Sequence, residues 1–397
     1  EDTSVVYSNP AGMVFREQDS AQASLYSLKS SVDFTNNGSS KAAAAGGAAI
    51  SGPNADGGTN NIIPNLYVHK KYNGFNLGLS VNAPFGSSTE YDRDWVGRYN
   101  AIESELKVPN IGLSIAKKIN DKFSVAGGIN YQKADVTLTN AIDYDTISKG
   151  INAALSASDG HAKLEGSDTA IGYNLGLMYK ISNKSNIGLA YRSQTKFDLT
   201  GRANFTEPSN LNAAVSAGLA AAGNLQDTDI SAKLVLPQKL SVGFNTELSQ
   251  KTMLYLNTSW TDWSVMKELN VDFASNQANS TTPFNWQDTY KVAVGIGHQY
   301  NDKLKLRFGV ASDGSATPND QVRSPRSPGG RLNWMSAGAG YSYNKDLQLD
   351  FAIARVKVQN SNSDTTVSSS TAALQSSLIG GYNSDSTIIG AQAVWKF

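Results

Sequence analysis

Short polar turns and long loops alternate strictly along this chain, and no other feature constrains the fold as much. The short turns lie at residues 71–74, 120–122, 182–185, 249–251, 301–303 and 344–346. The long loops, which are rich in Ser, Gly, Ala and Asn, lie at about 36–60, 86–100, 140–168, 204–228, 267–286, 313–330 and 359–386. These connections join fourteen strands. An even number of antiparallel strands, with tight turns at one end and long loops at the other, predicts an all-β outer-membrane barrel.

The predicted strands also alternate in polarity. At 171–181 the odd-numbered residues are Ile, Leu or Tyr, whereas the even-numbered ones are Gly, Asn, Met or Lys. Residues 303–311 and 389–397 show the same period of two, and so do residues 290–300 apart from His298. Successive side chains of a strand point to opposite faces. The pattern therefore indicates an apolar face toward lipid and a polar face toward a wet lumen.

The composition agrees with such a barrel and excludes several other classes. The formal net charge is zero, so no basic surface is expected to bind nucleic acid. Cys is absent, which leaves no disulfide framework and no thiolate for catalysis or for a metal, and we expect neither cofactor nor metal. No run of 18 apolar residues occurs, so a transmembrane helix is excluded.

A fourteen-stranded lumen is wide enough to leak unless it is plugged. The first strand is predicted at about residues 20–34, and a short segment precedes it. We therefore expect two parts: residues 1–19 form a hatch, or plug, inside the lumen, and residues 20–397 form the barrel.

One part of residues 1–19 resembles a known family. Asn9-Pro10-Ala11 is similar to the Asn-Pro-Ala element in the hatch of the FadL family of outer-membrane fatty acid and hydrocarbon transporters. The family's strand layout can be followed from residue 1 to 397, including 108–110, 236–237 and 259–264. The resemblance implies that Asn9, Pro10 and Ala11 gate the lumen. It also implies further hatch residues ahead of residue 1, so the hatch is expected to be incomplete here.

The resemblance further implies where and how the protein works. We expect a multi-pass barrel, monomeric, in the outer membrane of a Gram-negative bacterium, in contact with membrane lipid and lipopolysaccharide. Its partner would be a hydrophobic small molecule, transported passively and without chemistry. Long-chain fatty acids are the favoured substrate class, and uncharged hydrocarbons such as monoaromatics or alkanes are the alternative.

In this family the third strand is kinked, which opens a hole in the barrel wall. The corresponding strand is predicted at residues 75–91. Its alternation is interrupted by Asn82, Ala83, Pro84, Phe85 and Gly86, where Pro84 cannot donate a backbone hydrogen bond and Gly86 permits a bend. The resemblance implies that these residues frame a lateral opening. Release of a greasy molecule sideways into the membrane avoids rehydration, which costs about 0.8 kcal/mol for each exposed CH₂ group.

Two long loops contain short Ala-rich stretches with helical spacing, at 151–155 and 211–219. Leu211, Val215 and Leu219 fall on one helical face, and Leu155 belongs to the other stretch. The resemblance implies that such loops form an apolar groove that binds the ligand first. An alternative is that these residues only pack the loops together.

The residues that would bind a charged head group are less evident. The positions that align with the family's cationic residues lie near Asn140 and Thr282, which are neutral. Lys305, Arg307, Arg355 and Lys357 are possible luminal substitutes. The neutral residues at the aligned positions favour an uncharged substrate, so toluene-like aromatics, alkanes or a hydroxylated lipid remain open beside a fatty acid.

Two rival functions were weighed. An outer-membrane lipid hydrolase would need a catalytic histidine, but His69, His161 and His298 lie on separate predicted strands or loops, without the spacing of a zinc site. We therefore name no catalytic residue. A general diffusion porin would have an open lumen, whereas residues 1–19 are predicted to plug it.

Overall fold

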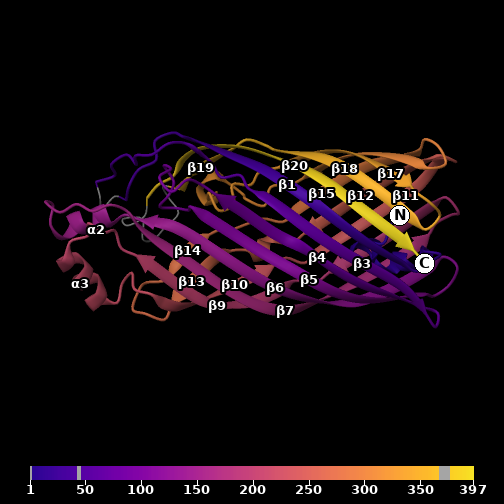
Figure 1. Ribbon diagram of the computed structural model, residues 1–397, viewed down its shortest axis with the longest axis horizontal. Coiled ribbons are helices and arrows are strands. Elements are labelled where there is room, and N and C mark those ends of the chain that lie inside the picture. Colours follow the sequence, from indigo (N-terminus) through magenta and orange to yellow (C-terminus); the bar gives the residue numbers. More distant parts are fainter. Residues whose placement is uncertain (1, 43–45, 366–375) are drawn as a thin grey trace.

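Each predicted short turn joins two neighbouring antiparallel strands in the computed structural model, which describes residues 2–42, 46–365 and 376–397. At the first turn, Asn73 and Gly74 have positive φ values of 48° and 78°. A two-residue turn between right-handed twisted strands requires this backbone, and Asn and Gly adopt it at least cost. The turns gather at one end of the molecule and the long loops at the other, with the strands tilted between them (Figure 1).

Most barrel strands are unbroken: β1 (Ser20–Asn36), β3 (Asn60–Tyr72), β4 (Phe75–Glu90), β5 (Glu103–Lys118), β6 (Phe123–Ile142), β7 (Gly160–Lys180), β16 (Leu304–Asp313), β17 (Leu332–Ser342) and β20 (Ile379–Lys396). The others are interrupted and carry two labels: β8 (Ser185–Arg192) with β9 (Thr195–Thr206), β11 (Lys239–Ser249) with β10 (Thr228–Leu236), β12 (Thr252–Thr261) with β13 (Glu268–Phe273), β15 (Thr289–Gln299) with β14 (Ser280–Pro283), and β18 (Leu347–Val358) with β19 (Ser361–Asp364). The two-residue strand β2 (Ala55–Asp56) pairs with β1.

The helices are short and lie outside the strands. They are α1 (Val5–Ser8), η1 (Pro10–Phe15), α2 (Tyr144–Ile151), α3 (Ala213–Ala222), η3 (Trp263–Val265) and η4 (Asp320–Val322). Among the helices within the described residues, none is long and apolar enough to span a membrane.

The first and last strands close the sheet. β20 pairs with β1 from Ser20–Lys396 to Asn36–Gly380, and its other edge pairs with β18. Closure through β1 and β20 pairs the backbone groups of the first and last strands, which would otherwise face lipid without partners. The outer face is apolar as expected: Ile171 is 71% exposed and Phe308 is 58% exposed. The predicted fourteen-stranded antiparallel barrel is thus confirmed.

Several strands extend further than the sequence predicted. β6 continues to Ile142 and β7 begins at Gly160, within the loop expected at 140–168. β13 and β14 lie within the loop expected at 267–286, and β20 begins inside the one expected at 359–386, part of which lies outside the described residues. The outer face of these extensions carries paired charges, such as Lys163 and Glu165 at 2.9 Å. A strand that stands above the lipid lacks an apolar face, so the alternation that reveals it in sequence disappears.

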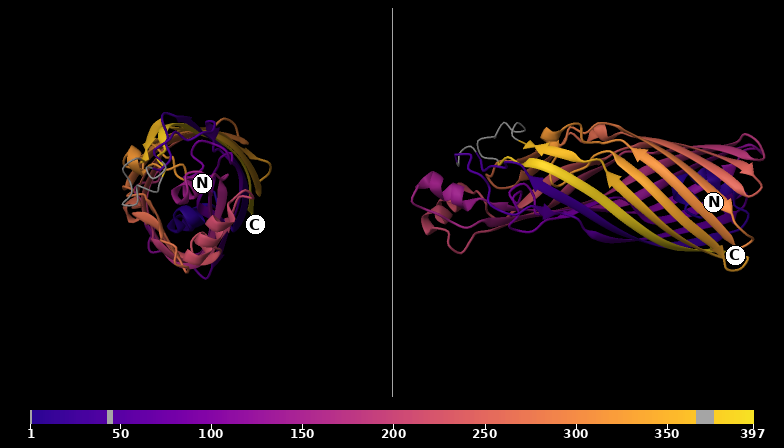
Figure 2. Two further views of the ribbon diagram at one scale, coloured as in Figure 1. Left: turned by 90° about the vertical axis from the view of Figure 1, so that its left-hand side faces the viewer. Right: turned by 90° about the horizontal axis from the view of Figure 1, so that it is seen from above.

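Residues 2–19, here called the N-terminal segment, lie inside the ring of strands at the end with the short turns (Figures 1 and 2). The wall accommodates the segment by means of glycines. A Cβ atom on Gly78 would be 2.6 Å from Val6 Cγ1, and one on Gly176 would be 2.4 Å from Asn9 Oδ1. Any side chain at these two positions would therefore displace the segment.

Candidate functional site

The barrel wall has a gap between β3 and β4. Their ladder runs from the turn at Tyr72–Phe75 only to Leu66–Val81. Beyond that point residues 60–65 of β3 pair with β1, and residues 82–90 of β4 pair with β5. The segment that precedes β3 and the end of β4 meet again at the far end, where the Glu90 amide donates to the Gly57 carbonyl. The gap in the β3–β4 ladder is therefore bounded at both ends and extends about 20 Å along the strands.

Proline and a bulge explain why the wall separates here. The register between β4 and β5 shifts between Asn82 and Phe85, which leaves Ala83 and Pro84 unpaired opposite Pro109. Proline has no N–H to donate, so a bulge at an unpaired edge is where a strand tolerates it. Ala83 points outward and is exposed, whereas Asn82 is buried and accepts a hydrogen bond from Asn110 at 2.9 Å.

A cluster of packed apolar side chains, here called the chamber, lies in the lumen behind the gap. Phe85, the first residue after the bulge, packs into it with its ring centroid 6.1 Å from that of Trp263. Trp286 stands edge-to-face on Trp263 at 5.1 Å. The buried members of the chamber, from β5, β6, β9, β10 and the interruptions after β12 and β14, are Val108, Ala134, Phe197, Leu199, Leu234, Leu236, Met266 and Phe284.

Three cavities lie one after another between the end that carries the long loops and the chamber. A cavity of about 450 Å³ lies nearest that end, and one of about 160 Å³ shares Asn140, Thr282 and Arg326 with it. The second shares Leu164 and Leu269 with a small apolar cavity of about 30 Å³ that borders the chamber. Polar lining thus gives way to apolar lining along the path toward the gap.

Arg326 is the cation on this path, and the sequence reasoning missed it. Its guanidinium donates to Ser104 Oγ at 2.8 Å, to the Glu103 carbonyl at 3.1 Å and, at longer range, to the Thr139 carbonyl and Asn140 Oδ1. No carboxylate within the described ranges forms an ion pair with it. Burial lowers the pKa of Arg326 to about 10, so the group stays charged at neutral pH.

Arg326 belongs to the loop between β16 and β17, which folds back into the lumen. Tyr91 Oη donates to the Pro325 carbonyl at 3.2 Å and so ties the loop to the inner wall. Pro325 and Pro328 flank the arginine and were the available sequence signal, because two prolines so close together stiffen a loop. Asn140 and Thr282, the neutral positions considered from sequence, line the same cavities as Arg326.

Two of the luminal substitutes considered from sequence are on the wrong face. Arg355 and Lys357 lie on the outer surface of β18, where they contact Asp385 at 2.6 Å and Asn383 at 2.6 Å. They share that face with Phe351, which is 60% exposed. Arg307 does point into the lumen, but it forms an ion pair with Asp350 at 2.8 Å. Lys305 shares the inner face of β16, near Tyr255.

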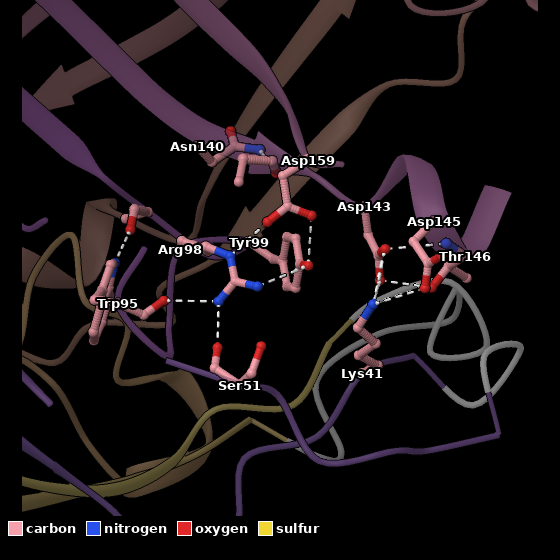
Figure 3. Close-up of polar contacts among 12 residues, drawn as sticks. Lys41, Ser51, Trp95, Arg98, Tyr99, Asn140, Asp143, Asp145, Thr146 and Asp159 are labelled. Atoms are coloured by element: carbon pink, nitrogen blue, oxygen red, sulfur yellow. Dashed lines mark hydrogen bonds and ion pairs between the residues drawn. The ribbon is translucent and has the colours of Figure 1, made fainter. Parts of the chain in front are cut away.

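The entrance is braced by ion pairs between three long loops (Figure 3). Arg98 Nε is 2.6 Å from Asp159 Oδ2, and Tyr99 Oη donates to the same carboxylate at 2.8 Å. Lys41 Nζ lies 3.0 Å from Asp143. Tyr99 and Asp143 also line the 450 Å³ cavity, so these contacts fix the width of its mouth.

The helical loops match the sequence prediction only in part. α3 (Ala213–Ala222) confirms the stretch at 211–219, begins at the Asn212 cap, and buries Val215 completely. The prediction of helical structure at 151–155 is wrong, because α2 ends at Ile151. Asp143 caps α2 through the Thr146 amide, so the helix starts at Tyr144, seven residues earlier than expected. The cavities described above are lined by residues other than Leu155, Leu211, Val215 and Leu219, whose role in ligand capture stays a prediction.

Asn9, Pro10 and Ala11 lie in the lumen against β6, β7 and β8. Asn9 Nδ2 donates to the carbonyls of Leu177 and Leu189, and Asn9 Oδ1 accepts from the Ala11 amide as the cap of η1. Ser124 Oγ donates to the Ala11 carbonyl at 2.9 Å. The Asn-Pro-Ala element thus ties the N-terminal segment to the inner wall, whereas residues 82–86 lie on β4. The role of Asn9, Pro10 and Ala11 as a gate stays a prediction, and so does the role of residues 82–86 as the frame of a lateral opening.

The three histidines are not brought together. His69 is buried on β3 and contacts Asn76 Oδ1 at 2.9 Å, and His298 lies on β15 beside Thr252. His161 stands near the start of β7. The described part of the chain contains no cluster of His, Asp and Glu that could hold a metal ion.

Comparison with known proteins shows which family has this architecture. Residues 1–397 match the family described as "Outer membrane protein transport protein (OMPP1/FadL/TodX)". A putative outer-membrane protein of Neisseria meningitidis is 30% identical over 100% of this chain and 90% of its own length. Long-chain fatty acid transport protein of Escherichia coli is 26% identical over 70% of this chain and 66% of its own length.

Solved structures agree with the fold. A Pseudomonas aeruginosa FadL homologue covers 100% of this chain and 94% of its own chain, with 23% identity and a TM-score of 0.88. The Pseudomonas putida toluene transporter TodX covers the same shares, with 16% identity and a TM-score of 0.74. With the whole-length family match, these likenesses establish that this chain is an outer-membrane barrel of Gram-negative type and belongs to the OMPP1/FadL/TodX family of transport proteins.

Proposed function

We propose that this protein carries long-chain fatty acids passively across the outer membrane and releases them sideways through the gap between β3 and β4. The family as a whole transports fatty acids or hydrocarbons. The observation that favours a fatty acid is the apolar chamber together with Arg326, an arginine without a carboxylate partner in the described residues, which lines the cavities on its outer side. No step in this proposal requires chemistry on the substrate.

The chamber supplies the driving force for binding the hydrocarbon chain. Each CH₂ group that enters it from water gains about 0.8 kcal/mol. Passage from the chamber through the gap to lipid exchanges one apolar environment for another, so the energy of the chain changes little. Release into the periplasm would cost the whole of that gain. Lateral release is therefore the route of lower energy for a long alkyl chain.

Arg326 supports a charged head group. A guanidinium presents its donors in a planar fork that matches a carboxylate. Its present partners are neutral oxygens, and a carboxylate of opposite charge is a stronger acceptor for guanidinium than a neutral oxygen. A fatty acid could thus place its carboxylate at Arg326 and its chain in the apolar cavities below. An uncharged hydrocarbon would gain nothing from this arginine.

The N-terminal segment is proposed to be the hatch. It lies in the lumen at the end with the short turns and is tied to the wall by hydrogen bonds rather than by a covalent link. Asn9, Pro10 and Ala11 are proposed to shift when ligand enters. Residues 82–86 are proposed to frame the exit, with Phe85 between chamber and gap.

The lateral exit can be tested with Ala83→Arg. Ala83 points out of the gap, so a long cationic side chain there would obstruct it. A matched control is Ala337→Arg on β17, which also places an arginine on the outer face but away from the gap. Uptake of labelled oleate would be measured in cells that lack their own transporter. We expect Ala83→Arg to abolish uptake and Ala337→Arg to retain it; equal uptake by both folded variants would refute the lateral route.

The same cells distinguish the substrate classes. Uptake of oleate and of toluene would be compared for the wild type and for Arg326→Met. Loss of oleate uptake with toluene unchanged would support the fatty acid. Efficient toluene uptake, with oleate ignored by the wild type, would instead favour the uncharged hydrocarbons.

A further inference from the structure

A second arginine, Arg192, lies between the chamber and the end with the short turns, and it donates to the N-terminal segment. Its NH2 group donates to the Tyr7 carbonyl at 2.8 Å, and its NH1 group donates to Asn130 Oδ1 at 3.0 Å. The guanidinium carbon also lies 3.7 Å from the centroid of the Tyr7 ring. Tyr7 thus binds Arg192 through both its backbone and its ring.

This arginine lacks the partner that a luminal cation usually has. No carboxylate in the described ranges forms an ion pair with Arg192, in contrast to Arg307 with Asp350. The residue directly across from it on β11 is another cation, Lys239. Two cations thus lie side by side where the segment meets the wall, and Asp313 is the carboxylate close enough to act on Lys239.

Arg192 also lies within reach of the chamber. Asn130 stands four residues from the chamber residue Ala134 on β6, about 13 Å along the strand. On the other side, Phe197 of the chamber follows Arg192 after the interruption between β8 and β9. A fatty acid with the far end of its chain in the chamber would therefore bring its carboxylate to Arg192 past the buried polar residue Gln132.

We propose that Arg192 is a second carboxylate site and the latch of the N-terminal segment: an arriving carboxylate replaces the Tyr7 carbonyl on the guanidinium and frees the segment. The inference rests on the proposed fatty acid function and adds to it a trigger. The exchange is favourable because a carboxylate is a stronger acceptor for guanidinium than a backbone carbonyl. A neutral chain of the same length would fill the chamber and leave the latch closed.

Hydrogen exchange of the N-terminal segment measures its release. The amides of Tyr7, Ser8 and Asn9 donate within α1 and its cap, and they are protected only while the segment is folded. The purified barrel would be studied alone, with oleate, and with oleyl alcohol as the neutral match. We expect oleate to accelerate exchange and oleyl alcohol to leave it unchanged.

Substitutions separate the latch from the chamber. Arg192→Met removes the charge-assisted bond to Tyr7, and exchange without ligand is expected to rise by roughly tenfold to a hundredfold. Arg192→Lys keeps the charge but not the planar fork of donors, so its exchange rate without ligand should lie between those of the wild type and Arg192→Met. Arg355→Met removes an outer-face arginine and is the control that should match the wild type. Because the chain has no cysteine, the labelling rate of Val6→Cys, a buried position, gives a second readout of opening.

The outcomes are distinct. Wild-type exchange in Arg192→Met, or equal acceleration by oleyl alcohol, would overturn the inference while leaving the transport proposal intact. Binding of oleate would be checked by native mass spectrometry. If the wild type binds no oleate, both the proposed function and this trigger fail; if it binds oleate and exchange stays unchanged, only the trigger fails.

Discussion

Replacing Arg326 with methionine tests how the head group is recognised. Methionine keeps much of the side-chain volume and removes the charge. A hydrogen bond to a charged group contributes about 1.5–3 kcal/mol, which corresponds to roughly a tenfold to hundredfold loss of affinity for a carboxylate. Affinity for the methyl ester of the same fatty acid should be unchanged, because an ester presents no charge to the missing guanidinium.

Two tryptophans provide the assay. Trp263 and Trp286 are in contact within the chamber, so a brominated ligand bound there should quench their fluorescence. Wild type and Arg326→Met would be titrated with dibromostearic acid and with its methyl ester. We expect Arg326→Met to bind the acid more weakly than the wild type and to bind the methyl ester equally well.

The protein itself should tolerate the change. Ser104 and two backbone carbonyls lose a donor, which costs about 1–3 kcal/mol, but a buried charge is also removed. The variant should therefore fold, which gel mobility before and after heating would check. Equal weakening of acid and ester, or no change in either, would refute a role for Arg326 in binding the carboxylate.

Three further predictions concern the gap, the segment and pH. Phe85→Ala removes the edge-to-face contact with Trp263, and affinity for dibromostearate should fall by about two- to tenfold in the same titration. Gly176→Ala places a Cβ atom 2.4 Å from Asn9 Oδ1, so the bonds of Asn9 to the wall should break and hydrogen exchange of residues 5–9 should accelerate. Because burial lowers the pKa of Arg326 to about 10, affinity for the acid should be constant from pH 7 to about 9 and should fall as pH rises through 10; a wild-type affinity that stays flat above pH 10 would contradict this.

The sequence predicted the lipid-facing barrel well, because lipid imposes a simple rule on every second residue. The odd-numbered residues of 171–181 follow that rule and are exposed on β7. Above the lipid the rule ceases to apply. The outer face of β7 there carries Lys163 and Glu165, and the strand was mistaken for a loop.

The same alternation could have corrected one error. Leu349, Phe351 and Ile353 face outward on β18, and a period of two places Arg355 and Lys357 on that face too. They were nevertheless considered as luminal cations. Residue type alone suggested the lumen, but strand register decides the face.

Arg326 could not be placed from sequence. It lies in a long loop, and alternation carries no information on whether a loop projects into water or folds into the lumen. Its position depends on contacts with distant residues, including Ser104, which is 222 residues away. The start of α2 was within reach, by contrast, because Asp143 followed by Thr146 is a recognisable helix cap.

Photolabelling tests the lateral route most directly. A fatty acid with a photoreactive group at the end of its chain would be added to the barrel in lipid, activated during transport, and the adducts mapped by mass spectrometry. The account predicts adducts on residues 82–86 and 60–65, on the two sides of the gap. Adducts on the luminal residues of β16 to β18 beside the N-terminal segment, such as Arg307 and Asp350, with none at the gap, would show that the ligand leaves through the lumen toward the periplasm and would contradict it.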